Sequence, residues 1–219
     1  MHKDIKTKDL FNCEIEYLKN LFNEEYPWQI LPKIKPFILE FIQNGANRFF
    51  ELKDGVFVGK NVKIASTATI EPPAIIGEGC EIRPGAYIRG NVIVGNNCVI
   101  GNSSELKNSI LLNNVQVPHY NYVGDSILGN FSHMGAGSIC SNLKADKKAV
   151  TINADEKIQT DLRKIGAFLG DCADVGCGSV LNPGTIIGKN TNIYPLSCVR
   201  GVVPSNAIYK DAKNIVEKR

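Results

Sequence analysis

The stretch VGKNVKIASTATIEPPAIIGEGCEIRPGAYIRGNVIVGNNCVIGNSSELK, residues 58–107, decides the fold. Large aliphatic residues recur in it at every sixth position: Val58, Ile64, Ile70, Ile76, Ile82, Ile88, Val94, Ile100 and Leu106. Four positions after each of these except the last stands a small or medium-sized residue: Val62, Ala68, Ala74, Cys80, Ala86, Val92, Cys98 and Ser104. An amphipathic helix needs a period of 3.6 and a half-buried strand a period of 2, so neither explains the stretch. A fixed period of six predicts a parallel β-helix.

The repeat predicts a column of stacked coils. Each hexad forms one short strand and its corner, and successive coils lie about 4.8 Å apart, the ordinary spacing of neighbouring strands. The aliphatic residues stack inside the column, where each contributes roughly 1.5–3 kcal/mol of free energy when it is fully buried. The residue four positions later packs inside a tight corner and therefore has to be small. The predicted fold class is mainly β.

The composition argues against a nucleic-acid or membrane partner. The chain has 219 residues, of which 43% are hydrophobic and 21% charged, and its formal net charge is +3. So small a charge is not typical of a nucleic-acid surface, and no stretch is apolar enough to span a bilayer. The first residues are charged and lack the apolar core of a signal peptide. We therefore expect a cytoplasmic protein.

Seven cysteines raise the possibility of a metal or disulfide site. Cys80 and Cys98 fall on the column of small residues, which predicts compact core residues on adjacent coils. There is no CxxC pair, and an odd number of cysteines without an export signal is typical of reduced thiols. A zinc site made of three histidines would need His2, His119 and His133 together, and His2 stands in the charged start of the chain. We expect no metal site.

The chain divides into three parts. Residues 1–54 contain two amphipathic helical stretches, which we expect to cap the open end of the column, where core and an unpaired edge would be exposed. Residues 55–205 form the β-helix, and residues 143–168 leave its repeat as a charged stretch that we interpret as a projecting loop. Residues 206–219 are a charged tail, which we expect to be a short helix or a frayed end.

The repeat loses its register around PHYNYVGD, residues 118–125. Leu111 follows Leu106 after five positions, and Leu128 follows Val123 after five, whereas the steps on either side are six. A local break in a regular pattern, with polar residues gathered at it, is where function is expected.

His119 lies in this segment and is the first candidate for catalysis. An unperturbed histidine titrates near pH 6.5, so this residue type can accept a proton at neutral pH. The residues alone leave two interpretations open: a general base, or a structural histidine that hydrogen-bonds a neighbouring coil.

Several segments resemble a known family. Residues 102–144, NSSELKNSILLNNVQVPHYNYVGDSILGNFSHMGAGSICSNLK, resemble the acetyltransferase half of the bifunctional N-acetylglucosamine-1-phosphate uridyltransferase/glucosamine-1-phosphate acetyltransferases and of archaeal sugar-1-phosphate nucleotidylyltransferases. With YPWQILPKI and SVLNPGTIIGKNTNIYPLSCVRGVVPSNAIYK, the whole chain resembles stand-alone bacterial proteins related to UDP-N-acetylglucosamine pyrophosphorylase. The resemblance implies the left-handed β-helix of hexapeptide-repeat acyltransferases, with three hexads to a coil. That hand is not the one that parallel crossovers usually adopt.

The resemblance also implies roles for individual residues in acetyl transfer to an amino sugar. The histidine that matches His119 is the general base, which takes a proton from the sugar amine as the amine attacks the acetyl-CoA thioester. Arg89 and Lys107 match cations that bind the sugar phosphate. Tyr122 matches a sugar-contacting tyrosine. Lys148 falls approximately on another phosphate-side lysine, although an ordinary surface charge remains the alternative.

The CoA side of the resemblance rests on fewer matches. Ala136, in the segment GAG, matches a residue that contacts CoA, and Lys210 falls near a cationic position for the CoA phosphates. Asp171 stands where the family has a serine beside CoA. His133 stands where the bifunctional enzymes have an asparagine, which makes it a substrate-side candidate and a second candidate base.

Together these features predict a CoA-dependent acyltransferase that uses acetyl-CoA as its co-substrate. A homotrimer is implied, because the family's sites lie between neighbouring columns. The nucleotidyltransferase loop L-x-x-G-x-G-[ST]-R-M has no counterpart, so we expect no pyrophosphorylase activity from this chain. The alternative hypothesis is a non-catalytic scaffold that binds a sugar nucleotide, or that pairs with a separate nucleotidyltransferase. The departures at His133, Asp171 and Pro195, the last of which stands where the family has an alanine, fit that alternative.

Overall fold

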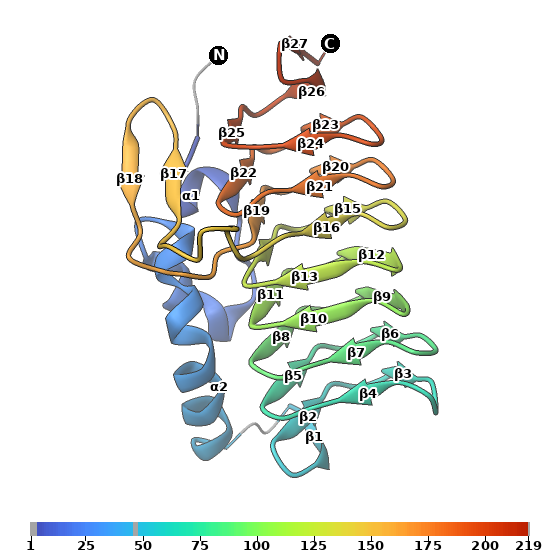
Figure 1. Ribbon diagram of the computed structural model, residues 1–219. Coiled ribbons are helices and arrows are strands. Elements are labelled where there is room, and N and C mark those ends of the chain that lie inside the picture. The colour runs from blue at the N-terminus through green and yellow to red at the C-terminus, as the bar shows by residue number, and fades with distance from the viewer. Residues whose placement is uncertain (1–3, 46–47, 219) are drawn as a thin grey trace.

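The chain winds into a column of stacked coils in a computed structural model that describes residues 4–45 and 48–218 (Figure 1). His2 lies outside the described residues. Three sheets form the sides of the column, and within it each strand pairs in parallel with the strands one coil before and one coil after it. The predicted mainly-β fold, a parallel β-helix accompanied by N-terminal helices, is confirmed. Every helix among the described residues is too short or too polar to cross a bilayer.

The strands of each sheet come from one side of successive coils. Sheet A contains β1 (Phe50–Lys53), β2 (Val56–Val58), β5 (Ala74–Ile76), β8 (Val92–Val94), β11 (Ser109–Leu111), β14 (Ile127–Leu128), β19 (Ala167–Leu169), β22 (Thr185–Ile187) and β25 (Val202–Val203). Sheet B contains β3 (Lys63–Ile64), β6 (Glu81–Ile82), β9 (Val99–Asn102), β12 (Gln116–His119), β15 (His133–Met134), β20 (Asp174–Val175), β23 (Asn192–Ile193), β26 (Ala207–Asp211) and β27 (Asn214–Glu217). Sheet C contains β4 (Thr69–Ile70), β7 (Tyr87–Ile88), β10 (Glu105–Lys107), β13 (Tyr122–Gly124), β16 (Ile139–Cys140), β21 (Val180–Leu181) and β24 (Cys198–Val199).

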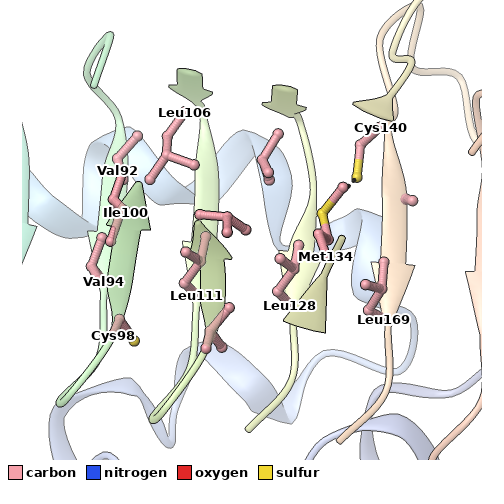
Figure 2. Packing of buried hydrophobic residues seen from close by; sticks show 14 of the residues in the cluster. Val92, Val94, Cys98, Ile100, Leu106, Leu111, Leu128, Met134, Cys140 and Leu169 are labelled. Atoms are coloured by element: carbon pink, nitrogen blue, oxygen red, sulfur yellow. Dashed lines mark hydrogen bonds between the residues drawn. The ribbon is translucent and has the colours of Figure 1, made fainter. Parts of the chain in front are cut away.

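The predicted column of aliphatic residues fills the interior. Figure 2 shows side chains of successive coils, such as Val94, Leu111 and Leu128, following one another through the core. Most of these side chains are fully inaccessible to solvent, and Cys80 and Cys98 are buried beside them as small core residues. The stacking of aliphatic side chains from successive coils therefore accounts for the six-residue period.

The two five-residue steps are shortened corners between sheets C and A. Strands β5 and β8 pair residues eighteen apart, as in Ala74 with Val92, whereas β11 and β14 pair Ile110 with Ile127, seventeen apart. The shorter coil has one residue fewer at this corner, where Asn108 is the single residue between β10 and β11 and has a φ of +47°. The same happens one coil later at Asp125, with a φ of +49°.

The N-terminal part is built of short helices. These are α1 (Thr7–Leu10), η1 (Glu16–Leu18), η2 (Leu21–Asn23), η3 (Pro27–Gln29), η4 (Leu31–Lys33) and α2 (Ile34–Gln43). Apolar residues of this segment form a second hydrophobic cluster with outward-facing residues of sheet A: Ile75, Ile93, Ile110, Ile127, Phe168, Ile186 and Val202. α2 contacts β8, and Figure 1 shows it running along the side of the column.

The N-terminal segment therefore covers a side of the column, and the expectation that it caps the open end was wrong. The reason is the pair of apolar residues in the strands of sheet A from β5 to β25, such as Ile75 and Ile76, which point to opposite faces. One member of each pair fills the interior, and the other would leave an apolar stripe exposed on the outside. Burying this stripe stabilises the contact with the helices.

Residues 143–166 leave the coil and form a hairpin of β17 (Thr151–Asn153) and β18 (Lys157–Gln159). The excursion is two residues shorter than the predicted 143–168, because Ala167 and Phe168 already belong to β19. We call this segment the arm. Val150 and Ile152 are buried on the same outer cluster as the helices, so the arm is anchored along one side of its hairpin. Gly166 returns the chain to the column, where its N–H donates to the carbonyl of Asp125 at 2.8 Å.

The C-terminal tail is neither a helix nor a frayed end. β26 continues sheet B, and β27 pairs back on it antiparallel, with Tyr209 opposite Ile215. Tyr209 is buried in the end of the main core, which explains why the tail extends the column in spite of its charge.

Phe168→Ala tests the apolar stripe beneath the helices. Phe168 is fully buried and its ring lies 6.4 Å from that of Trp28, so truncation should lower the free energy of unfolding by about 3–5 kcal/mol in a urea titration. The matched control is Phe131→Ala, because Phe131 is 62% exposed and its loss should change stability by no more than about 0.5 kcal/mol. Similar losses in both variants would contradict this assignment.

Candidate functional site

His119 ends β12 at the corner between sheets B and C, and its side chain is exposed. Tyr120, with a φ of +52°, turns the chain into sheet C. Buried Asn121 fixes the corner: its Oδ1 accepts from the backbone N–H of His119 at 3.0 Å, and its Nδ2 donates to the carbonyl of Gly135 at 2.8 Å. The backbone of His119 is thus rigidly held while its imidazole faces outward.

The segment GAG stacks on this corner one coil later. The N–H of Gly137 donates to the carbonyl of His119 at 3.0 Å, and the carbonyl of Ala136 accepts from the N–H of Gly178 in the coil that follows. Ala136 and Gly137 are exposed, and a Cβ on Gly137 would meet nothing within 4 Å. His119 and Ala136 are therefore brought together, as the resemblance implied.

Arg89, Lys107 and Tyr122 belong to sheet C and its edge: Tyr122 begins β13 three positions after His119, whereas Arg89 and Lys107 stand where their strands lead into sheet A. Glu105 pairs in register with Tyr87 on one side and with Tyr122 on the other. The guanidinium of Arg89 contacts the carboxylate of Glu105 at 2.8 Å and lies 5.9 Å from the centre of the Tyr87 ring. Neighbouring strands thus present a cation, a carboxylate and two phenol rings side by side.

Asp125 is the centre of the polar network on this face. Lys107 Nζ lies 3.2 Å from both carboxylate oxygens of Asp125. Asn108 donates to Oδ1 at 2.9 Å and Asn142 to Oδ2 at 2.6 Å. The side chain of Asp125 is only 6% exposed, so this carboxylate is a buried anion with its charge paired and its oxygens hydrogen-bonded.

Tyr122 lies over Gly124 and reaches the same network. A Cβ placed on Gly124 would stand 2.5 Å from the hydroxyl of Tyr122 and 2.8 Å from Nδ2 of Asn142, so only glycine leaves room for this arrangement. Asn142 Nδ2 donates to the Tyr122 hydroxyl at 3.1 Å. Burial raises the pKa of Tyr122, with smaller contributions from the carboxylates of Glu105 and Asp125.

His133 lies on sheet B, opposite Gln116 of β12, and forms its own pair with a carboxylate. Its Nδ1 lies 2.8 Å from Oδ1 of Asp174, and this hydrogen bond lowers the pKa of Asp174. His133 thus has an orienting carboxylate partner. It stands three positions before Ala136, the residue that stacks on the corner of His119.

Lys148 and Lys210 are exposed, and among the described residues neither has a hydrogen bond or ion pair to this cluster. The backbone N–H of Lys148 donates to Asp146 in the arm, and its ammonium has no ion pair among the described residues. Lys210 follows Tyr209 in β26, four coils beyond His119, a separation of about 19 Å at the usual strand spacing.

Asp171 is not brought to the site, contrary to the expectation that it binds the cofactor. It lies at the corner between sheets A and B, where its Oδ1 accepts from the backbone N–H of Asn130 at 2.8 Å and its Oδ2 from that of Asn12 at 2.8 Å. Lys189 also approaches it, at 3.4 Å. Its carboxylate therefore fastens the N-terminal segment to the column.

Four residues of this face were missed by the sequence reasoning: Glu105, Gly124, Asp125 and Asn142. A signal for Asp125 was present, because it is the single corner residue of a five-residue step. Asp125 and Lys107 are eighteen positions apart in the sequence. Only the length of a coil shows that residues at this separation lie next to each other.

Gly124→Ala tests how Tyr122 is seated. The added methyl group should lift the phenol off the sheet, and because burial is the main cause of its raised pKa, the pKa of Tyr122 should fall toward its ordinary value. Ultraviolet titration of the phenolate checks this, with Tyr122→Phe in each background to assign the signal. An unchanged pKa in the Gly124→Ala variant would contradict the seating.

Comparisons with known proteins cover about half of the chain. Residues 70–162 match the family model described as the GMPPB C-terminal domain. The bifunctional protein GlmU of Methanococcus maripaludis is 34% identical over 112 residues, which cover 50% of this chain and 27% of that protein. The bifunctional sugar-1-phosphate nucleotidylyltransferase/acetyltransferase of Sulfurisphaera tokodaii is 34% identical over 102 residues, which cover 46% and 25%. The chain thus spans about a quarter of the length of these relatives.

Solved structures were compared as well. The UDP-N-acetylglucosamine acyltransferase of Francisella novicida aligns with a TM-score of 0.49 at 14% identity, covering 74% of this chain and 67% of that one. A mutant form of the perosamine N-acetyltransferase of Caulobacter crescentus, in complex with CoA and GDP-perosamine, aligns with a TM-score of 0.44 at 18% identity, covering 72% and 56%. Over about half of its length, this chain is similar to GlmU-type bifunctional proteins, and the resemblance expected from its motifs is confirmed.

Proposed function

We propose that this chain is a CoA-dependent acyltransferase that transfers an acetyl group from acetyl-CoA to the amino group of an amino sugar phosphate such as glucosamine-1-phosphate. One observation carries the proposal. The exposed His119 stands at a rigid corner, where its carbonyl accepts from the N–H of Gly137 and where Tyr122 begins the next strand three positions later. The similarity to bifunctional sugar-phosphate acetyltransferases over this segment supports it.

The reaction needs one base and an anion-binding surface. A neutral amine attacks the thioester carbonyl, the C–N bond forms, and His119 Nδ1 or Nε2 accepts the proton that the amine loses. The C–S bond then breaks, and the CoA thiolate takes up a proton to leave as the thiol. Asn121 fixes the backbone of His119, and among the described residues the imidazole has no carboxylate partner of the kind that His133 has in Asp174.

The substrate side of the proposal lies on sheet C. Arg89 and Lys107 bind the phosphate group of the sugar, and Tyr122 contacts the sugar ring. Arginine suits a phosphate because its planar fork can form two parallel hydrogen bonds, whereas lysine acts as a point charge. His133 and the arm residue Lys148 belong to the outer part of the same substrate region.

The proposed CoA-binding surface extends from His119 along the column toward its C-terminal end. Ala136 and Gly137 offer exposed backbone beside which a thioester can approach closely, and Lys210 lies about 19 Å further along, within reach of an extended CoA phosphate chain. We propose a homotrimer, because the imidazole of His119 faces outward and a neighbouring column would supply the opposite wall of the cleft.

His119→Ala tests the base. The variant should lose about 10²- to 10⁴-fold in kcat/KM, the usual contribution of a placed general base, when free CoA is measured with acetyl-CoA and glucosamine-1-phosphate. His133→Ala is the comparison, since His133 is the second candidate base, and it should lose much less. Equal rates in wild type and His119→Ala, at equal thermal stability, would remove His119 from the mechanism.

The second candidate is a non-catalytic scaffold or a partner subunit of a separate nucleotidyltransferase. One observation favours it: Arg89 and Lys107 are both already paired with carboxylates, so the face does not carry an open positive charge. Under this hypothesis, the chain would bind a sugar nucleotide or another protein without transferring an acyl group.

Acetyl-CoA binding separates the two candidates. An acyltransferase should be stabilised by about 2.7 kcal/mol when acetyl-CoA is present at a hundred times its dissociation constant, and its melting temperature should rise accordingly. A melting temperature unchanged by millimolar acetyl-CoA would favour the scaffold. Free adenosine is the control for non-specific binding.

A further inference from the structure

Two carboxylates stand beside the two cations of the sheet C face. Arg89 Nη1 lies 2.8 Å from Oε1 of Glu105, and Lys107 Nζ lies 3.2 Å from both oxygens of Asp125. Two positive charges are therefore balanced by two negative ones. A phosphate that approaches this face meets a quartet of balanced charges, so the carboxylates compete with it for the two cations.

The two ion pairs differ in how firmly they are held. The side chains of Arg89 and Glu105 are 43% and 32% exposed, and no other hydrogen bond to the Glu105 carboxylate is found among the described residues. An exposed pair of this kind is worth little, corresponding to at most about a fivefold effect on an equilibrium. Glu105 can therefore leave Arg89 at small cost.

Asp125 cannot leave in the same way. Its side chain is 6% exposed, and besides Lys107 it accepts hydrogen bonds from Asn108 and Asn142. Separating a buried carboxylate from its cation leaves an uncompensated charge, which is strongly unfavourable. The network also extends through Asn142 to the hydroxyl of Tyr122, so movement of Asp125 would unseat that ring.

On the basis of the proposed function, we propose that Glu105 is a displaceable counter-ion that tunes the affinity of this face for phosphate: it occupies Arg89 until a dianionic phosphate group replaces it. Asp125 is its fixed counterpart and keeps Lys107 in place as a donor. A phosphate dianion carries more charge than the carboxylate it displaces and can accept two parallel hydrogen bonds from the guanidinium. A neutral sugar does not compete with Glu105 for Arg89, so its binding should not depend on this carboxylate.

The register of the sheet supports this arrangement. Glu105 stands between Tyr87 and Tyr122 on neighbouring strands, and Arg89 reaches back over Tyr87 to meet it. A phosphate bound by Arg89 would thus lie beside Tyr122, the residue proposed to contact the sugar. The carboxylate of Glu105 contributes to the raised pKa of Tyr122, so the two side chains share one electrostatic environment.

Calorimetric titration with glucosamine-1-phosphate tests the inference independently of catalysis. Glu105→Gln removes the competing charge and keeps the shape, so it should tighten binding by about two- to fivefold at low ionic strength. The gain should vanish near 1 M salt, where exposed charges are screened. Binding of N-acetylglucosamine, which has no phosphate, should not change.

Glu81→Gln is the matched control. Glu81 forms an equivalent pair with Arg83 on sheet B, at 3.2 Å, away from the sheet C face, and its loss should leave the affinity unaltered. Asp125→Asn should weaken binding of glucosamine-1-phosphate instead of tightening it, because Lys107 loses its fixed partner. We expect glucosamine-1-phosphate to bind more tightly to Glu105→Gln and more weakly to Asp125→Asn. This contrast would show that the carboxylate of Glu105 is displaceable and that of Asp125 is fixed.

The possible failures are distinguishable. If wild type transfers acetyl groups but Glu105→Gln binds glucosamine-1-phosphate no more tightly than wild type, the role of Glu105 is wrong while the proposed function stands. A gain equal for phosphorylated and neutral sugar would also overturn it. If wild type neither binds glucosamine-1-phosphate nor releases CoA, both the inference and the proposed function fail.

Discussion

Hydrogen bonding between the backbones of successive coils is the constraint on which the rest of the structure depends. It fixes which residues stand side by side, so that Lys107 lies next to Gly124 and Glu105 next to Tyr122 although they are seventeen positions apart. The inner side chains then stack because the rungs are in register, and the outer ones form rows across each sheet. Every polar contact on sheet C follows from this spacing and from the two coils that are one residue shorter than their neighbours.

The column could be predicted from the sequence, whereas the placement of the helices could not. A period of six is a local property, and it reports directly on burial in the interior. The outer stripe under the helices has its own signal, the apolar doublets such as Ile93–Val94 and Phe168–Leu169. Neighbouring residues of a strand face opposite sides, so each doublet places one residue in the inner core and one on the outer surface. The sequence does not show that the N-terminal helices cover the outer residue.

The site was predictable where it is local and not where it depends on distant partners. His119 stands in the segment where the repeat changes step, and its corner is formed by residues close in the chain. Asp171 was assigned to the cofactor, yet it bonds Asn12, 159 positions away, and Asn130, 41 positions away. The charge of an aspartate indicates that a buried carboxylate needs a hydrogen-bond donor or a cation. The stacking of the coils determines which donor lies next to it.

The arm leaves and re-enters the column at almost the same point. The carbonyl of Asn142 accepts from the N–H of Ile165, and Phe168 then pairs with Ile127 as if the preceding segment had never intervened. The two ends of this excursion are already held together by the solenoid, so extra length adds only a slowly growing entropic cost of loop closure. Evolution or an engineer can therefore exchange this excursion for one of another length or chemistry. Its root lies beside Asp125, so such a graft would reshape the rim of the outer face of sheet C while the coils beneath stay unchanged.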